Sequence, residues 1–216
     1  MNYVKPEFEI LTPISEGGED ELRSIESIAR VCYKSEPKTD SFEDTKKFIG
    51  GLIKRGHLAM IEHSKLTVKF VTDRCVTHEI VRHRMAAYAQ ESTRWCNYAK
   101  DKFGAEISLI EPDFSKAKDP YSAKVHFDMV VKTAEHCYLY LVNEQGLAPQ
   151  IARRVLPHAL KTEIVVTANY REWMHILELR TAPDCDPEMR EIMSALLLTL
   201  RKKIPVIFDM VGMKGA

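Results

Sequence analysis

Residues 65–84 read KLTVKFVTDRCVTHEIVRHR, and their hydrophobic period changes halfway along the stretch. Apolar and polar residues alternate over 65–73, which predicts a half-buried strand. Over 75–84 the apolar residues recur with helical spacing instead, which predicts a helix. We therefore expect a fold that combines strands and helices, with Arg82-His83-Arg84 at the end of this helix.

The rest of the chain adds mainly helices. A β-branched run predicts a strand over 161–168, and a short one is expected over 107–110. Residues 85–98 are polar and small with no clear period, so we predict an ordered loop. Helices are predicted over 19–35, from Ser41 to Gly56, and over 121–144, 148–155, 171–180 and 186–203. Because the helices do not alternate regularly with strands, the predicted fold class is α+β: a helix-rich single domain over residues 1–216 with a small, mainly antiparallel sheet.

The composition is that of an ordinary globular protein. The 216 residues carry 31 Lys and Arg against 31 Asp and Glu, so the formal net charge is zero. This balance argues against a nucleic-acid coat or a polybasic membrane-surface protein. No apolar run approaches the roughly 18 residues that a membrane helix needs, and the N-terminal residues lack a signal-peptide pattern. We therefore expect a cytoplasmic protein.

Metal and disulfide chemistry have little support in the sequence. No HExxH, GxGxxG or P-loop motif occurs, so a bound dinucleotide would have to be held without those devices. We expect reduced thiols and no metal, because the cysteines are odd in number and no two have CxxC spacing. The cysteines are Cys32, Cys75, Cys96, Cys137 and Cys185.

The densest chemical feature is Arg82-His83-Arg84, which Ser92, Thr93 and Arg94 follow closely. Like charges this close repel one another unless anions lie between them. Arginine side chains bind phosphate and carboxylate in a bidentate way, so the pattern favours an anionic ligand. A solvated helix end with surface arginines would give the same spacing, and this alternative stays open.

A second cationic group follows downstream, with Arg153 and Arg154 first and Asn169, Arg171 and Arg180 after them. Asn169 falls at the end of a predicted strand, where binding residues are common. Arg171 and Arg180 are expected on roughly the same side of one helix. A capping asparagine with surface charges is the simpler interpretation of these residues.

Together these segments match a known pattern. Arg-His-Arg, seven residues and then Ser92 is the motif of the flavin-dependent thymidylate synthases, and the chain resembles that family over about residues 10–205. Three further segments match in order: His57, five residues and His63; Ala-Arg-Arg-Val-Leu-Pro over 152–157; and Asn169-x-Arg171 followed by Leu179-Arg180.

The resemblance implies a homotetramer with four active sites, each shared between subunits. It also implies reductive methylation of dUMP to dTMP, with methylenetetrahydrofolate as carbon donor, FAD as redox cofactor and NADPH as reductant. Neither a nucleic acid nor a membrane is an expected partner. The implied FAD-binding residues are His57, Arg82, His83, Arg84, Gln90, Asn169, Arg171 and His175. The implied dUMP-binding residues are Glu79, Arg82, Gln90, Glu91, Ser92, Thr93, Arg94, Arg153 and Arg180.

The resemblance makes Arg180 and Ser92 the catalytic candidates and brings Arg94 and Arg153 near the phosphate. Arg180, at the pyrimidine, is expected to stabilise negative charge that builds on the ring. Ser92 is expected to position the substrate, since an unassisted serine hydroxyl is a poor nucleophile at neutral pH. The flavin is expected to carry the redox chemistry.

The motif departs from the usual family pattern, RHRxxSxNExSxRY. Here Ala87, Ala89, Gln90 and Trp95 replace Ser, Asn, Glu and Tyr, while Glu79 and His175 stand where Gln and Asn are common. These changes leave open a related methylase of another pyrimidine nucleotide, such as UMP, and a flavin-binding homologue without activity. A third alternative is a module that stacks single-stranded nucleic acid on Tyr88, Trp95 and Tyr98.

Overall fold

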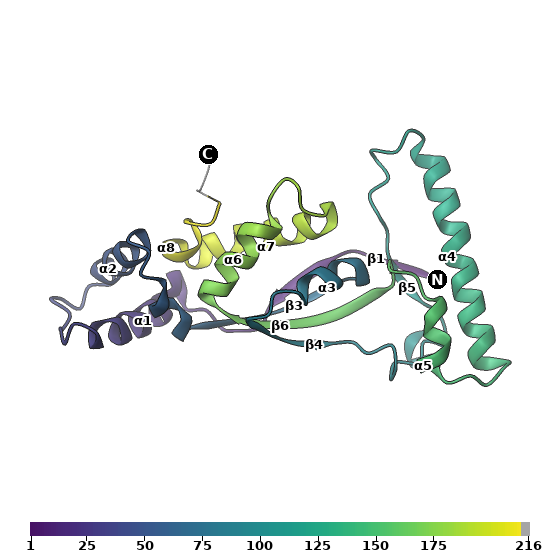
Figure 1. Cartoon of the computed structure of the whole chain (residues 1–216), viewed down its shortest axis with the longest axis horizontal. Helices are drawn as coiled ribbons and strands as arrows, with labels where there is room; N and C mark the ends of the chain where they lie inside the picture. The colour runs from purple at the N-terminus through teal and green to yellow at the C-terminus, as the bar shows by residue number, and fades with distance from the viewer. Residues whose placement is uncertain (213–216) are drawn as a thin grey trace. The chain divides into compact units, whose positions relative to one another are not determined.

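The computed structural model describes residues 1–212. Figure 1 shows its helices and strands, coloured from purple at the N-terminus to yellow at the C-terminus. The α-helices are α1 (Glu19–Val31), α2 (Phe42–Lys54), α3 (Arg74–Ile80), α4 (Pro120–Asn143), α5 (Pro149–Ala152), α6 (Tyr170–Arg180), α7 (Pro187–Lys203) and α8 (Pro205–Phe208). The strands are β1 (Asn2–Val4), β2 (Glu7–Ile10), β3 (Lys65–Asp73), β4 (Ala86–Gln90), β5 (Ser108–Ile110) and β6 (Lys161–Asn169). Short 3₁₀ helices are η1 (Glu16–Gly18), η2 (Leu58–His63), η3 (Asp101–Phe103) and η4 (Arg153–Val155).

Four of the strands form one sheet in the order β2-β3-β6-β4. On β3 and β6, the hydroxyls of Thr67 and Thr167 lie 2.9 Å apart. At the other end, the Arg74 amide just after β3 donates to the His158 carbonyl just before β6, at 2.9 Å. Residue numbers therefore rise along β3 in the direction in which they fall along β6, so the two strands are antiparallel. This confirms the expected α+β class with a small antiparallel sheet.

A separate pair of strands, β1 and β5, is parallel, with Tyr3 opposite Leu109. Contacts divide the chain into two compact units. The first unit comprises Met1–Glu7, Phe70–Arg82 and Ala89–Val165. The second comprises Phe8–Lys69, His83–Tyr88 and the chain from Val166 on.

The core of the first unit lies against the long helix α4. The Asp119 carboxylate accepts the Ser122 amide at 3.0 Å, and Pro120 occupies the first turn, so α4 has a well-formed N-terminus. Among the described residues, no helix combines the length and the apolar character needed to span a membrane. The buried side chains of this core are Tyr98, Ile107, Leu109, Val131, Tyr138, Ala152, Ala159 and Leu160.

In the second unit, α1 packs on α2, and α6 packs on η2 and α7. Trp173 of α6 is fully buried, and its indole N–H donates to the Leu66 carbonyl at 2.9 Å. The Tyr170 amide at the start of α6 donates to the Ser64 carbonyl at 3.0 Å. These bonds fix α6, which carries several of the candidate site residues, against the strand β3 of the same unit.

The helix predicted over 75–84 is α3, and it ends four residues early, at Ile80. The following residues turn toward β4, with the Tyr88 hydroxyl donating to the His83 carbonyl at 2.5 Å. Arg82-His83-Arg84 therefore lies in a turn, not on a helix. Hydrophobic spacing alone did not reveal that the motif lies in a turn. The helix ends because the residues that follow the motif pair in the sheet.

The loop predicted over 85–98 is wrong in its first part, which forms β4. Alanine has a low strand propensity, and three of the five residues of β4 are alanine. Pairing with β6 makes the strand: just beyond β4, the Glu91 amide donates to the Glu163 carbonyl at 2.8 Å. The short elements β1, β2 and α8 were also missed, because three or four residues carry too little pattern.

The remaining predicted helices and strands are confirmed, with bounds within four residues of those expected. The strand over 65–73 is β3, and the helix over 171–180 is α6. Gly56, beyond the end of α2, has φ +78°, the left-handed conformation that favours glycine after a helix.

Candidate functional site

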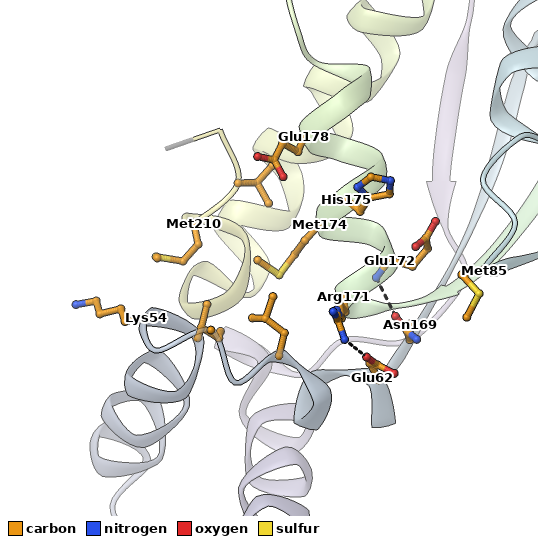
Figure 2. Close-up of a pocket in the computed structure, with 14 residues that line it drawn as sticks. Lys54, Glu62, Met85, Asn169, Arg171, Glu172, Met174, His175, Glu178 and Met210 are labelled. Carbon is orange, nitrogen blue, oxygen red and sulfur yellow. Dashed lines mark hydrogen bonds and ion pairs between the residues drawn. The ribbon is translucent and has the colours of Figure 1, made fainter. Parts of the chain in front are cut away.

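A cavity of about 740 Å³ lies in the second unit, beside α6 (Figure 2). Asn169 positions this helix: it is the last residue of β6, and its side-chain oxygen accepts the Glu172 amide at 2.8 Å as the helix cap. The side chains that α6 turns toward the cavity are spaced three and four residues apart, as one helical face requires. They are Arg171, Met174, His175 and Glu178.

The walls of this cavity are of mixed chemistry. Part of the lining is apolar, from Ile53, Leu58, Met85, Met210 and Val211. The polar part carries both signs of charge, because Lys54 and Arg171 line it together with the carboxylates of Glu62, Glu172 and Glu178.

Arg171 forms an ion pair with Glu62, drawn in Figure 2. Both side chains are exposed, so the pair contributes little to stability, and its main effect is to hold the guanidinium at the cavity. Arg171 also lines a smaller cavity of about 360 Å³, which includes His57. One arginine therefore borders both of these cavities.

The expectation that Arg171 and Arg180 share a side of the helix is wrong. Nine residues of an α-helix make about two and a half turns, so the two side chains leave α6 on opposite sides. Arg171 pairs with Glu62, whereas Arg180 donates from Nε to His83 Nε2 at 2.9 Å.

His83 is the buried residue of the Arg-His-Arg motif, with 7% of its surface exposed. Its Nε2 accepts from Arg180, so the proton of the neutral ring is on Nδ1, which lies 3.9 Å from a Glu172 carboxylate oxygen. The His175 ring is edge-on to it, with centroids 6.0 Å apart. Burial, with the charges of Arg180 and His175, lowers the pKa of His83 to about 4. The ring is therefore neutral at pH 7.

This burial predicts a pH-dependent stability. An unfolded histidine takes up a proton near pH 6.5, whereas folded His83 stays neutral down to about pH 4. Between these values the unfolded state binds more protons, so the stabilisation is complete above pH 6.5 and is lost as the pH falls toward 4. We expect His83 to account for about 2 kcal/mol of the stability lost between pH 7 and pH 5.

Urea unfolding at the two pH values measures this loss, and His83→Gln is the control that removes the titrating group. The variant should lose about 2 kcal/mol less than the parent on acidification. An equal loss in both proteins would show that His83 is not the responsible group.

The first unit holds the other arginine-rich group, around the turn formed by Ser92, Thr93 and Arg94. Arg153 donates to the Thr93 hydroxyl at 3.1 Å. Arg94 donates from Nε to Gln150 at 3.2 Å, and its guanidinium lies 5.0 Å from the centre of the Trp95 ring. An arginine from a distant segment, Arg153, thus contacts the short turn that carries Arg94.

The residues just before this turn are held from within the same unit. Gln90 donates its amide to Thr77 at 3.0 Å and to Thr162 at 3.4 Å, both fully buried. The Glu91 carboxylate accepts from the Tyr98 hydroxyl at 2.6 Å. Both side chains therefore have partners inside the fold.

The structure gathers most of the expected site residues into two groups, one in each unit. The second-unit group is His83, Asn169, Arg171, His175 and Arg180, with His57 at the smaller cavity. The first-unit group is Gln90, Glu91, Ser92, Thr93, Arg94 and Arg153. Glu79 lies in the last turn of α3, and Arg82 and Arg84 are exposed.

Sequence reasoning missed several residues of the larger cavity. Met174 and Glu178 share the helical face of Arg171 and His175, so helical spacing carried a signal for them. Glu62 had no such signal, because it is 109 residues from the arginine with which it pairs.

Comparison with known proteins identifies the class to which this fold and site belong. Residues 15–206 match the family described as thymidylate synthase complementing protein, so the chain belongs to that family. Its relatives include proteins named flavin-dependent thymidylate synthase from several organisms.

Three of these relatives illustrate the similarity. The protein from Corynebacterium aurimucosum is 31% identical over 91% of this chain and 82% of its own length. The protein from Mycobacteroides abscessus is 32% identical over 85% of this chain and 77% of its own. The protein from Pyrococcus furiosus is 31% identical over 84% and 75%.

Proposed function

We propose that this protein is a flavin-dependent thymidylate synthase that converts dUMP to dTMP. Methylenetetrahydrofolate supplies the carbon and leaves as tetrahydrofolate, while NADPH supplies the reducing equivalents and leaves as NADP⁺. The family match over residues 15–206 carries this proposal. The cationic turn in one unit and the cavity beside α6 in the other support it.

The cavity beside α6 fits the demands of FAD. A diphosphate needs a cation, which Arg171 provides, and a ring system needs apolar walls, which Met174 and Met85 provide. FAD, when bound, supplies the redox chemistry of the reaction. We assign its binding to Asn169, Arg171 and His175, with His57, Arg82, His83, Arg84 and Gln90 as further contacts.

Variants of Asn169 separate its two roles. Asn169→Asp keeps an oxygen that accepts the Glu172 amide but puts a negative charge at the cavity, so we expect FAD affinity to fall by roughly tenfold or more with the helix cap intact. Asn169→Ala removes the cap as well and should also cost about 1 kcal/mol of stability. Flavin titration and urea unfolding measure the two effects. Unchanged FAD affinity in Asn169→Asp would remove this residue from the cofactor site.

The arginines and the serine of the motif take distinct roles toward dUMP. Arg94 and Arg153 bind the phosphate, and Arg180 stabilises negative charge on the pyrimidine. Ser92 orients the ring and is not the nucleophile, since its hydroxyl accepts the Arg94 amide and an unassisted serine hydroxyl is a poor nucleophile at neutral pH. The remaining residues of the proposed nucleotide site are Glu79, Arg82, Gln90, Glu91 and Thr93.

We further propose that the protein is a cytoplasmic homotetramer with shared sites, as the family resemblance implies. The helix α4 supports an oligomer, because it exposes large apolar side chains to water and a subunit interface would bury them. Tyr121 is 79% exposed, Val130 61% and Met129 59%.

Turnover with two competing nucleotides tests the proposed reaction. The protein is loaded with FAD and given methylenetetrahydrofolate, NADPH and equal amounts of dUMP and UMP, and the products are separated by chromatography. We expect dTMP, with UMP unchanged and no product when NADPH is omitted. Methylated UMP would show that the protein is a methylase of UMP and not of dUMP. No product from either nucleotide would indicate an inactive homologue.

A further inference from the structure

Glu91 directly precedes the turn of Ser92, Thr93 and Arg94, and all of its polar groups are engaged. Its amide donates to the Glu163 carbonyl at 2.8 Å. Its carbonyl accepts from Arg74 Nη2 at 2.9 Å. The peptide groups on both sides of Glu91 are therefore fixed before the turn begins.

The Glu91 side chain is held as firmly as its backbone. One carboxylate oxygen accepts from the Tyr98 hydroxyl at 2.6 Å, and the other lies 3.3 Å from Lys161 Nζ. Lys161 also pairs with Glu163 at 2.7 Å. The Glu91 side chain is only 15% exposed, so water weakens these contacts less than at a surface pair.

Fixing Glu91 fixes the start of the turn. The Ser92 carbonyl accepts the amides of Trp95 at 3.0 Å and Cys96 at 2.8 Å. The Thr93 hydroxyl accepts from Arg153 at 3.1 Å. Arg94, one of the two arginines assigned to the nucleotide phosphate, is therefore carried by a turn that several hydrogen bonds hold, and Arg153, the other, contacts this turn at Thr93.

We propose that Arg74, Tyr98 and Lys161 act through Glu91 as positioning residues, which hold this turn ready for the nucleotide. We call the four residues the Glu91 clamp. A turn ordered in advance binds more tightly, because less conformational entropy is lost when the ligand arrives. The proposal rests on the proposed function in one respect, that the nucleotide is dUMP.

Tyr98→Phe tests the clamp, because it removes the bond to Glu91 and keeps a ring in the core. The matched control is Tyr138→Phe in the same core: the Tyr138 ring lies 6.0 Å from that of Tyr98, and within residues 1–212 its buried hydroxyl is not among the groups that contact Glu91. With FAD-loaded protein, equilibrium dialysis should show dUMP binding weakened by roughly tenfold in Tyr98→Phe. The value of kcat at saturating dUMP and the flavin content should stay within about twofold of the parent, and the control should match the parent in all three.

Amide hydrogen exchange without any nucleotide tests the ordering itself. We expect faster exchange at the Trp95 and Cys96 amides in Tyr98→Phe and no change in the control. Glu91→Gln provides a second variant that leaves the core ring untouched, and it should speed exchange at the same two amides. Exchange is the readout for this variant, because Glu91 is also assigned to the nucleotide site.

The outcomes separate this proposal from the proposed function. Unchanged dUMP affinity in Tyr98→Phe, together with unchanged exchange in Tyr98→Phe and Glu91→Gln, would overturn the clamp. An equal change in Tyr138→Phe would also overturn it, since the effect would then be a general loosening of the core. If the parent protein binds no dUMP while exchange still responds to Tyr98→Phe, the clamp orders the turn and the proposed function fails.

Discussion

Replacing Arg180 by alanine is expected to lower kcat by about two to three orders of magnitude while flavin remains bound. The guanidinium is the cation assigned to the pyrimidine, and removing one preformed charge-stabilising group typically costs this much. Flavin should remain, because Asn169, Arg171 and His175 still line the cavity. Steady-state turnover and the flavin content of the purified variant measure both effects.

The same variant should change His83. Arg180 donates to His83 Nε2 and its charge lowers the pKa of that ring, so its loss should raise the pKa toward the ordinary value. Arg180→Lys is the conservative control: it keeps the positive charge without the planar donor and should retain more turnover than alanine. Normal turnover in Arg180→Ala would refute the role assigned to this residue.

Replacing Arg153 by alanine is expected to raise the KM for dUMP by about 30-fold. Arg153 reaches the Thr93 hydroxyl at 3.1 Å, on the turn assigned to the phosphate. A charge-assisted bond of this kind contributes about 1.5–3 kcal/mol, which corresponds to the expected change in affinity. Initial rates over a range of dUMP concentrations measure the change.

Arg154 is the matched control, because the adjacent arginine donates to the carbonyls of Gln150 and Ile151. Arg154→Ala removes the same charge and should leave the KM within about threefold. Deoxyuridine, which lacks the phosphate, should bind equally weakly to the parent and to Arg153→Ala. A similar rise in both variants would mean that general electrostatics, and not a phosphate contact, cause the effect.

Most of the fold could be predicted from hydrophobic period, because the helices α1, α2, α6 and α7 and the strand β6 each bury one clear face. The strand β4 could not be predicted, since its alanines acquire a strand conformation only by pairing with β6. The same pairing ends α3 at Ile80 and leaves Arg82-His83-Arg84 in a turn.

The candidate site shows a similar division. The family resemblance predicted Asn169, Arg171 and His175 as site residues, and all three line one cavity. Spacing could not reveal that Glu62 pairs with Arg171 or that Tyr98 holds Glu91, because tertiary structure alone creates these contacts. Helical geometry alone places Arg171 and Arg180 on opposite sides of α6, so this arrangement could have been predicted from the sequence. The expectation that they share a side was wrong.

The visible spectrum of the purified protein, incubated with FAD, freed of the excess and kept under anaerobic conditions, tests the central claim most directly. We expect the absorbance band of oxidised flavin, its bleaching on addition of NADPH, and faster bleaching when dUMP is present. A protein that stays colourless and takes up no added FAD would contradict the account.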